Sequence, residues 1–167
     1  MKIVSLIPAA TEIVCLLGFQ DSLIGISHEC DFPPDLSHCE RLTFSRIPLS
    51  ITSAEIDALT TQKATQDDGL FGVHGQRILE LCPDVIITQS ICDVCAVSRG
   101  ALGAVMADLP SATKLLTLSP STLMDVLESI LYVSRELQSP GRGHEVYAQL
   151  SERLERLRSQ KQTIATK

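Results

Sequence analysis

Two cysteines stand close together in the segment TQSICDVCAVS, residues 88–98, just after an apolar run. These two, Cys92 and Cys95, combine with His28 and Cys30 of the upstream segment SHECDFPP to offer one imidazole and three sulfurs. That combination is the ligand set of a tetrahedral Cys₃His zinc site, and cysteine thiolates also hold iron-sulfur clusters. The four residues are therefore predicted metal ligands, for zinc or iron.

The same residues fit other chemistry, and the sequence leaves these alternatives open. His28 or a thiolate could coordinate the metal of a bound chelate. Cysteines are also small apolar residues that often fill protein cores, and a loop histidine often bonds only its own loop. A CxxC pair after a strand also suits thiol redox chemistry. That option is disfavoured, because Asp93 between the cysteines should raise the thiol pKa and the rest of the chain does not resemble a thioredoxin.

The composition limits the kind of protein. The chain has 167 residues, 44% of them hydrophobic, which is enough for one substantial core but cramped for two independent domains. A formal net charge of −6 gives no basic surface for a phosphate backbone, and four Phe and two Tyr offer little stacking on bases. We therefore expect one domain with an appendage and no nucleic-acid partner.

The N-terminus begins with a lysine and an apolar run, as export signals do. Glu12 interrupts that run, however, and Pro8 fits better as the start of a helix. No stretch reaches the roughly 18 apolar residues of a membrane span. We therefore expect a cytoplasmic protein, or a periplasmic one if an export signal was trimmed, and we expect its six cysteines to be reduced.

Apolar runs, helix caps and proline or glycine breaks predict strands that alternate with helices. The predicted strands cover residues 3–6, 23–27, 85–88 and 114–118, with a further short strand at 42–44. The predicted helices begin at Pro8, Thr52, Gly75, Gly100 and Pro120, and the last covers about His144 to Arg158 after the break SPGRG.

Strands separated by helices pair in parallel through right-handed crossovers. The order therefore predicts an α/β fold, a parallel sheet of about four to five strands with helices on both faces, followed by a long C-terminal helix. Ligands of such sheets bind beyond the carboxyl ends of the strands. The segments HECDFPP and QSICDVC each follow a predicted strand. Both are expected at the same edge, which would bring His28, Cys30, Cys92 and Cys95 to one site.

Three segments, IVSLIPAATEIVCLLG, LIGISHECDFPP and RILELCPDVIITQ, together resemble a known family. They are similar to the class III periplasmic binding proteins of iron-siderophore and vitamin B12 uptake. The similarity is greatest to the cobalamin-binding-protein-like branch, whose members carry the same SHECD-P and Q-x-C-x-V-C loops and often lack an export signal. The resemblance covers nearly the whole chain.

The resemblance implies two α/β lobes joined by one long helix, with the ligand held between them. For this chain it implies a ligand-binding lobe at residues 1–139 and a connector-type helix and tail at 140–167, with no second lobe. The apolar stripe of the last helix would then lack a surface to pack on, so we expect a homo-oligomer, or a second lobe from a partner chain. The stripe consists of Val146, Leu150, Leu154 and Leu157.

The function that the resemblance implies is non-covalent binding of cobalamin, a related corrinoid or another metal chelate, as in ABC-type uptake systems. The expected ligand-binding residues lie at the strand ends and in nearby loops: Pro8, Ala9, Thr11, His28, Glu29, Phe32, Arg46 and Gln89. Phe32 is expected to contact a planar macrocycle, and Arg46 to pair with an acidic group of the ligand.

Binding is favoured over catalysis, because the sequence contains no nucleotide-binding loop and no hydrolase nucleophile motif. Two alternatives stay open. One is a cytoplasmic zinc or iron protein, or a thiol enzyme, that uses the Cys/His cluster. The other is a non-catalytic interaction module.

Overall fold

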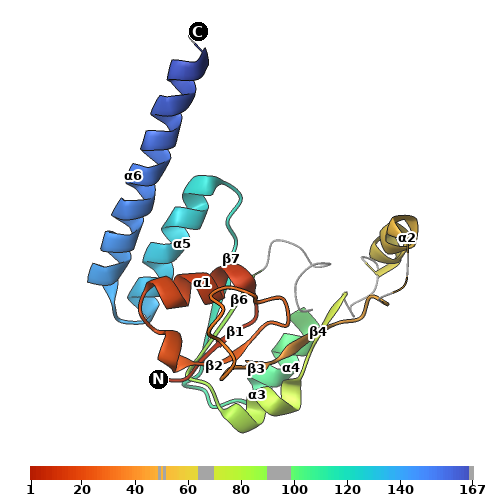
Figure 1. The fold of residues 1–167 in the computed structure, drawn as a ribbon. Coiled ribbons are helices and arrows are strands. Elements are labelled where there is room, and N and C mark those ends of the chain that lie inside the picture. Colours follow the sequence, from red (N-terminus) through yellow and green to blue (C-terminus); the bar gives the residue numbers. More distant parts are fainter. Residues whose placement is uncertain (49, 51, 64–69, 90–98, 166–167) are drawn as a thin grey trace. The chain divides into compact units, whose positions relative to one another are not determined.

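The structure of the chain, a computed structural model, describes residues 1–167 except 49, 51, 64–69, 90–98 and 166–167 (Figure 1). The chain divides into two compact units, Met1–Ser119 and Pro120–Lys167. The sequence-based division after residue 139 separates a ligand-binding lobe from a connector helix by expected role. It is a different kind of division from these compact units, and it stays a prediction.

The first unit is built on a five-stranded sheet in the order β3-β2-β1-β6-β7, and every neighbouring pair is parallel. The strands are β1 (Ile3–Ser5), β2 (Leu23–Ile26), β3 (Glu40–Arg41), β6 (Val85–Gln89) and β7 (Lys114–Leu118). The predicted α/β class is confirmed, and the four longer strands lie where their apolar runs predicted them.

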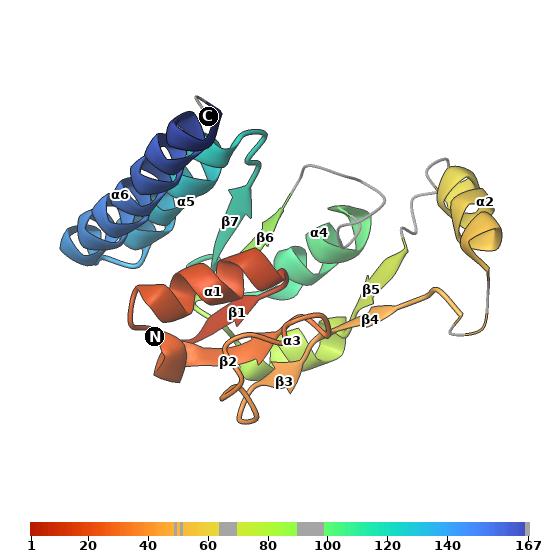
Figure 2. The ribbon, with the colours of Figure 1, turned by 45° about the horizontal axis from the view of Figure 1, so that its top comes forward.

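Helices cover both faces of this sheet, as predicted (Figure 2). Side chains alternate along a strand, so each strand contributes to both faces. Val4 and Ile86 are part of one buried core together with residues of α3 (Gly75–Leu81) and α4 (Arg99–Asp108). The opposite face is covered by α1 (Pro8–Leu16), whose buried residues are Ala10, Thr11, Ile13 and Val14.

A two-stranded antiparallel ribbon, β4 (Thr43–Ser45) paired with β5 (Phe71–Val73), continues from the end of β3. The sequence predicted a strand near β4 but did not predict β5, which has only three residues. The Phe44 ring packs closely on Gly72, where an added Cβ would lie 2.2 Å from the ring and force it to move. The absence of a side chain at position 72 thus leaves room for the ring of the residue paired with it.

Helix α2 (Ser53–Lys63) follows the ribbon and begins at the predicted capping box. The Glu55 carboxylate accepts from the Thr52 backbone N–H at 2.7 Å, and the Glu55 N–H donates to the Thr52 hydroxyl at 3.4 Å. This reciprocal pair satisfies two amides that a helix start otherwise leaves without partners.

The second unit is a hairpin of two helices, α5 (Leu123–Glu136) and α6 (Pro140–Ala165). Two sequence predictions are corrected here. α5 begins after a capping box formed by Thr122 and Asp125, not at Pro120, because this pair satisfies the first amides. The SPGRG segment does not delay α6, since Pro140 is its first residue.

The apolar stripe of α6 is buried near the start of the helix and exposed further along it. Near the start, Gly143 allows close packing of the two helices, because an added Cβ would lie 2.0 Å from the Ser134 hydroxyl on α5. Val146 is buried, whereas Leu157 is 55% exposed. The part of the stripe near the hairpin turn is thus covered within the chain. Self-association through the remainder stays a prediction.

Within the described residues, no helix is both long and apolar enough to cross a membrane.

Candidate ligand-binding edge of the sheet

The carboxyl ends of three strands meet at one edge of the sheet. β1 lies between β2 and β6 and is parallel to both, with Ser5 paired to Ile26 on one side and Ile87 on the other. Chain segments that leave β1, β2 and β6 therefore start side by side. We name this place the strand-end edge and define it by residues 6–11, 27–32 and 89.

The segment that leaves β1 is fixed by a chain of buried hydrogen bonds. The Thr11 hydroxyl donates to the Ser5 hydroxyl at 2.8 Å, and Ser5 donates to the Ile7 carbonyl at 3.0 Å. The Cys30 sulfur lies 3.1 Å from the Thr11 hydroxyl oxygen. This contact joins the segment that leaves β1 to the segment that leaves β2.

The Cys30 thiol has the properties of a protonated, structural group. Its residue is buried, with an exposed fraction of 2%. Burial raises the pKa of this thiol, and the Thr11 hydrogen bond offsets that increase only in part. A metal site needs a thiolate, so binding of a metal at Cys30 would have to displace the proton and the contact with Thr11.

In the segment that leaves β2, three atoms are in contact with one hydroxyl group, that of Thr43. The Thr43 oxygen lies 3.0 Å from the Ser27 hydroxyl, 2.9 Å from the His28 backbone nitrogen and 2.6 Å from His28 Nδ1. Thr43 is the first residue of β4, and its exposed fraction is 3%. One buried threonine thus connects the ribbon to the strand-end edge.

Arg41 also holds this segment. Its guanidinium donates to the Ser27 carbonyl at 2.9 Å and also to the Cys30 carbonyl. Arg41 is the last residue of β3, at the carboxyl end of that strand. Residues 27–30 are therefore held through both their backbone and their side chains.

His28 has one bonded ring nitrogen and one without a hydrogen bond. Its side chain is 25% exposed, and its ring centroid lies 5.5 Å from that of Phe71. Nδ1 is bonded to Thr43, whereas Nε2 is shielded from solvent and has no hydrogen-bond partner among the described residues. A Glu29 carboxylate oxygen lies 3.5 Å from Nε2, beyond good hydrogen-bond range.

That arrangement affects the tautomer of His28. The adjacent carboxylate favours a proton on Nε2, which leaves Nδ1 to accept from the Thr43 hydroxyl. Thr43 in turn accepts from the His28 N–H and the Ser27 hydroxyl. With the proton on Nε2 the ring offers a donor to an acceptor group, and with the other tautomer it offers a lone pair to a metal.

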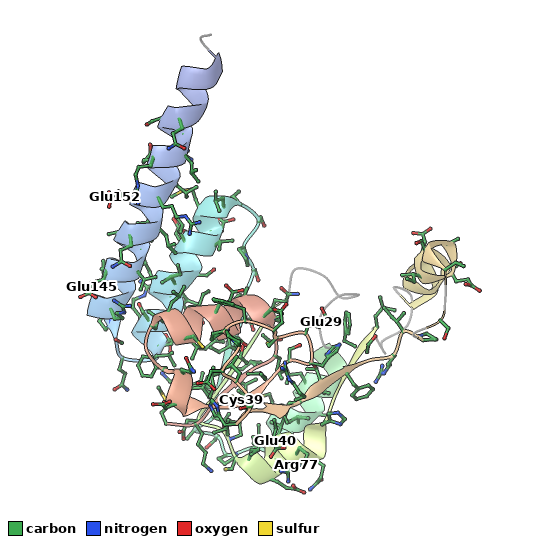
Figure 3. The ribbon with its side chains drawn as sticks, in the orientation of Figure 1. Glu29, Cys39, Glu40, Arg77, Glu145 and Glu152 are labelled. Carbon is green, nitrogen blue, oxygen red and sulfur yellow. The ribbon has the colours of Figure 1, made fainter. Side chains whose placement is uncertain are left out.

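Several predicted ligand contacts are exposed at this edge. Glu29 has a side chain 56% exposed, and Phe32 is 59% exposed (Figure 3 shows Glu29). Ala9 is exposed in the first turn of α1, while Pro8 and Gln89 are partly exposed. Thr11 differs, because it is fully buried and its hydroxyl bonds within the chain. Ligand contact by any of these residues stays a prediction.

Arg46 lies on the other face of the ribbon from His28. Its guanidinium carbon lies 5.8 Å from the centroid of the Phe44 ring. Phe44 and Thr43 are consecutive in β4, so their side chains point to opposite faces, and His28 contacts Thr43. The predicted pairing of Arg46 with a ligand is untested.

The predicted metal set is only partly visible. Cys92 and Cys95 lie outside the described residues. Among the residues that the structure does describe, no three His, Cys, Asp or Glu side chains come together in a way that could hold a metal ion. Metal binding by His28, Cys30, Cys92 and Cys95 therefore stays a prediction.

The sequence analysis missed the residues that hold the edge together, namely Ser5, Ser27, Arg41 and Thr43. For Ser5 and Ser27, the sequence does contain a pattern that predicts such a role. Ser5 and Ser27 are small polar residues at the ends of apolar strand runs, a place where a hydroxyl must find a buried partner. For Arg41 and Thr43 the signal is weak, because their roles depend on where β3 and β4 lie.

Comparisons with known proteins give a result only at the level of structure. No family model matches the sequence, and no curated protein matches it. The vitamin B12 binding protein of Vibrio cholerae has a TM-score of 0.67 and 23% identity, over 95% of this chain and 50% of that chain. The haem-binding protein HutB of the same organism also has a TM-score of 0.67, with 16% identity, over 95% and 49%.

A third structure, the haem-binding protein RhuT of Roseiflexus, has a TM-score of 0.65 and 21% identity, over 91% of this chain and 46% of that chain. All three proteins are periplasmic. This chain therefore has the fold of the N-terminal lobe of a class III periplasmic binding protein, and the resemblance inferred from its sequence is confirmed for the fold. It spans about half the length of the solved structures it matches.

Proposed function

We propose that this chain binds a metal chelate non-covalently at the strand-end edge, and that the chelate is cobalamin or a related corrinoid. The fold supports the coarser part of the proposal, because it is shared with proteins described as binding vitamin B12 or haem. In open parallel sheets, the carboxyl ends of the strands are also where ligands bind.

The proposal rests mainly on one observation: the Nε2 atom of His28 is shielded from solvent and has no hydrogen-bond partner among the described residues. A buried polar atom without a partner costs free energy, and in native proteins such atoms usually have a role. Among the described residues Nε2 has no hydrogen-bond partner, and it lies at the strand-end edge, within a segment that Thr43 and Arg41 hold in place. A bound chelate would satisfy it, either with an amide oxygen that accepts from Nε2 or with a metal that Nε2 coordinates.

The neighbouring exposed groups suit a large, flat ligand. Phe32 offers an aromatic ring that can contact a macrocycle, and Glu29 can accept from amide N–H groups. Pro8, Ala9 and Gln89 would line the side formed by β1 and β6. The chain's own contribution is thus orientation and contact, without a covalent step.

The proposal extends to a wider setting. As one lobe of an ABC-type uptake component, the chain would need a second wall for its ligand, supplied by a second lobe, a partner chain or a second copy. Its location, cytoplasmic or periplasmic, belongs to the same proposal.

A titration with aquacobalamin, followed by visible absorption, tests this function. We expect saturable binding at one ligand per chain with a shift of the corrin bands. His28→Ala should weaken it at least about tenfold, by removing one buried polar contact. The matched control is His74→Ala, an exposed histidine of the same unit. Absence of binding to both cobalamin and haem would overturn the proposal.

Metal analysis of the protein purified without chelators distinguishes the main alternative. About one equivalent of tightly held zinc or iron, lost in Cys92→Ser and Cys95→Ser, would favour the metalloprotein over the chelate-binding lobe.

A further inference from the structure

We propose that the strand-end edge selects metal chelates with a neutral, amide-bearing periphery and discriminates against chelates that carry carboxylates. This inference rests on the proposed function and specifies its ligand class. It separates two ligands of the structurally similar proteins. The side chains of cobalamin's corrin ring end in amides, whereas haem carries two propionate carboxylates.

The charged residues of the edge are acidic. Glu29 and Asp31 are both exposed, and they follow the carboxyl end of β2 directly. The residues that define the strand-end edge, 6–11, 27–32 and 89, include no Lys or Arg. A ligand carboxylate at this edge would therefore approach two carboxylates.

Two arginines of the strands next to this edge have contacts within the chain. The guanidinium of Arg41 donates to two backbone carbonyls of the segment, so it is used to hold the edge. Arg46 lies over the Phe44 ring on the opposite face of the ribbon. Lys2 and Lys114 stand at the amino ends of β1 and β7, across the sheet from the strand-end edge.

The chemistry of the ligand decides whether the two carboxylates attract it or repel it. Amide N–H groups can donate to the carboxylates of Glu29 and Asp31, and such charge-assisted hydrogen bonds are stronger than neutral ones. A carboxylate in the same position has no proton to donate and is repelled. Specificity then arises from repulsion of one ligand class as well as attraction of the other.

The test uses two ligands that differ by one charge, cyanocobalamin and its monocarboxylate with one peripheral amide hydrolysed. At low salt the monocarboxylate should bind at least about threefold more weakly, a difference expected for partly exposed charges. In 1 M sodium chloride the difference should shrink, because the screening length falls to about 3 Å. Haem should bind more weakly than cyanocobalamin.

The variant Glu29→Gln/Asp31→Asn should remove this discrimination while cyanocobalamin still binds. Its matched control, Asp21→Asn/Asp35→Asn, removes the same charge from the other end of the sheet. Asp21 lies just before β2, and the Asp35 carbonyl accepts from Gln20 beside it. The control should discriminate as the parent protein does.

The outcomes separate the two proposals. Equal affinity for both corrinoids at low salt, or discrimination that persists in Glu29→Gln/Asp31→Asn, would overturn the charge selection and leave chelate binding intact. Tighter binding of haem than of cyanocobalamin would do the same. Failure of every chelate to bind would instead remove the proposed function itself.

Discussion

The side chains at the strand-end edge and directly beneath it fall into two sets, one buried and one exposed. Ser27 and Cys30 are buried and bonded within the chain, whereas Glu29, Asp31 and Phe32 are exposed. We name the buried groups the floor of the edge, comprising Ser5, Thr11, Ser27, Cys30 and Thr43, and the three exposed residues its rim. The comparison shows that adjacent residues differ in role, since the floor fixes the backbone and the side chains of the rim are exposed.

The largest effect is expected for Thr43→Val, which keeps the side-chain shape and removes the hydroxyl of the floor. It would leave the His28 backbone N–H, His28 Nδ1 and the Ser27 hydroxyl without their shared partner. We expect a loss of about 3 kcal/mol in the free energy of unfolding, measured by urea denaturation. The control Thr117→Val, at an exposed position of β7, should cost less than about 0.5 kcal/mol. Equal losses would show that Thr43 does not hold the floor.

For Thr11→Val we expect the free energy of unfolding to fall by a smaller amount, about 1.5 kcal/mol, because Ser5 and Cys30 keep part of their packing. Combined with Cys30→Ala in a double-mutant cycle, it should reveal a coupling of about 0.5 to 1 kcal/mol. Additive losses would mean that the contact between Thr11 and the Cys30 thiol has no energetic weight.

A pH effect is expected at Cys39, whose sulfur donates to the Leu23 carbonyl at the amino end of β2. Burial raises the pKa of this thiol from 9.0 to about 11. Above pH 9 the unfolded chain releases this proton while the folded chain keeps it, so stability should fall as the pH rises from 9 to 11. Thermal unfolding should show a shallower fall in Cys39→Ala than in the parent protein. Parallel pH profiles would contradict the shift.

The smallest effect on stability is expected at the rim. Phe32→Ala removes a ring that is 59% exposed, so the free energy of unfolding should change by less than about 0.5 kcal/mol. Affinity for cyanocobalamin should nevertheless fall several-fold, because the ring is proposed to contact the macrocycle. A large loss of stability with unchanged affinity would reverse the assignment of Phe32 from rim to floor.

Much of the fold could be predicted because apolar runs and caps are local signals. The alternation of strands and helices predicted a parallel sheet, and hence that segments far apart in sequence leave one edge. The ribbon was only half predicted, since β5 is three residues long and depends on its pairing with β4. α5 was predicted to start too early, because Ser119-Pro120 and Thr122 are both suitable starts and the helix begins after the capping box at Thr122.

The candidate site could be predicted less completely. His28 and Glu29 were placed at the strand-end edge by their position after an apolar run. Contact of Thr11 with a ligand stays a prediction, and the structure adds a role that the sequence did not predict, a hydroxyl bond to Ser5 inside the chain. The role of Thr43 depends on a contact across 15 residues, which no local pattern reveals.

The most direct test of the central claim is a map of backbone amide chemical shifts in isotope-labelled protein as cyanocobalamin is added. We predict that the shifts change at residues 6–11, 27–32 and 89, where three strand ends meet, and stay unchanged in α6 and at the amino ends of the strands. Changes concentrated in α6, or around Lys2, Asp35 and Lys114, with residues 27–32 unaffected, would contradict the claim.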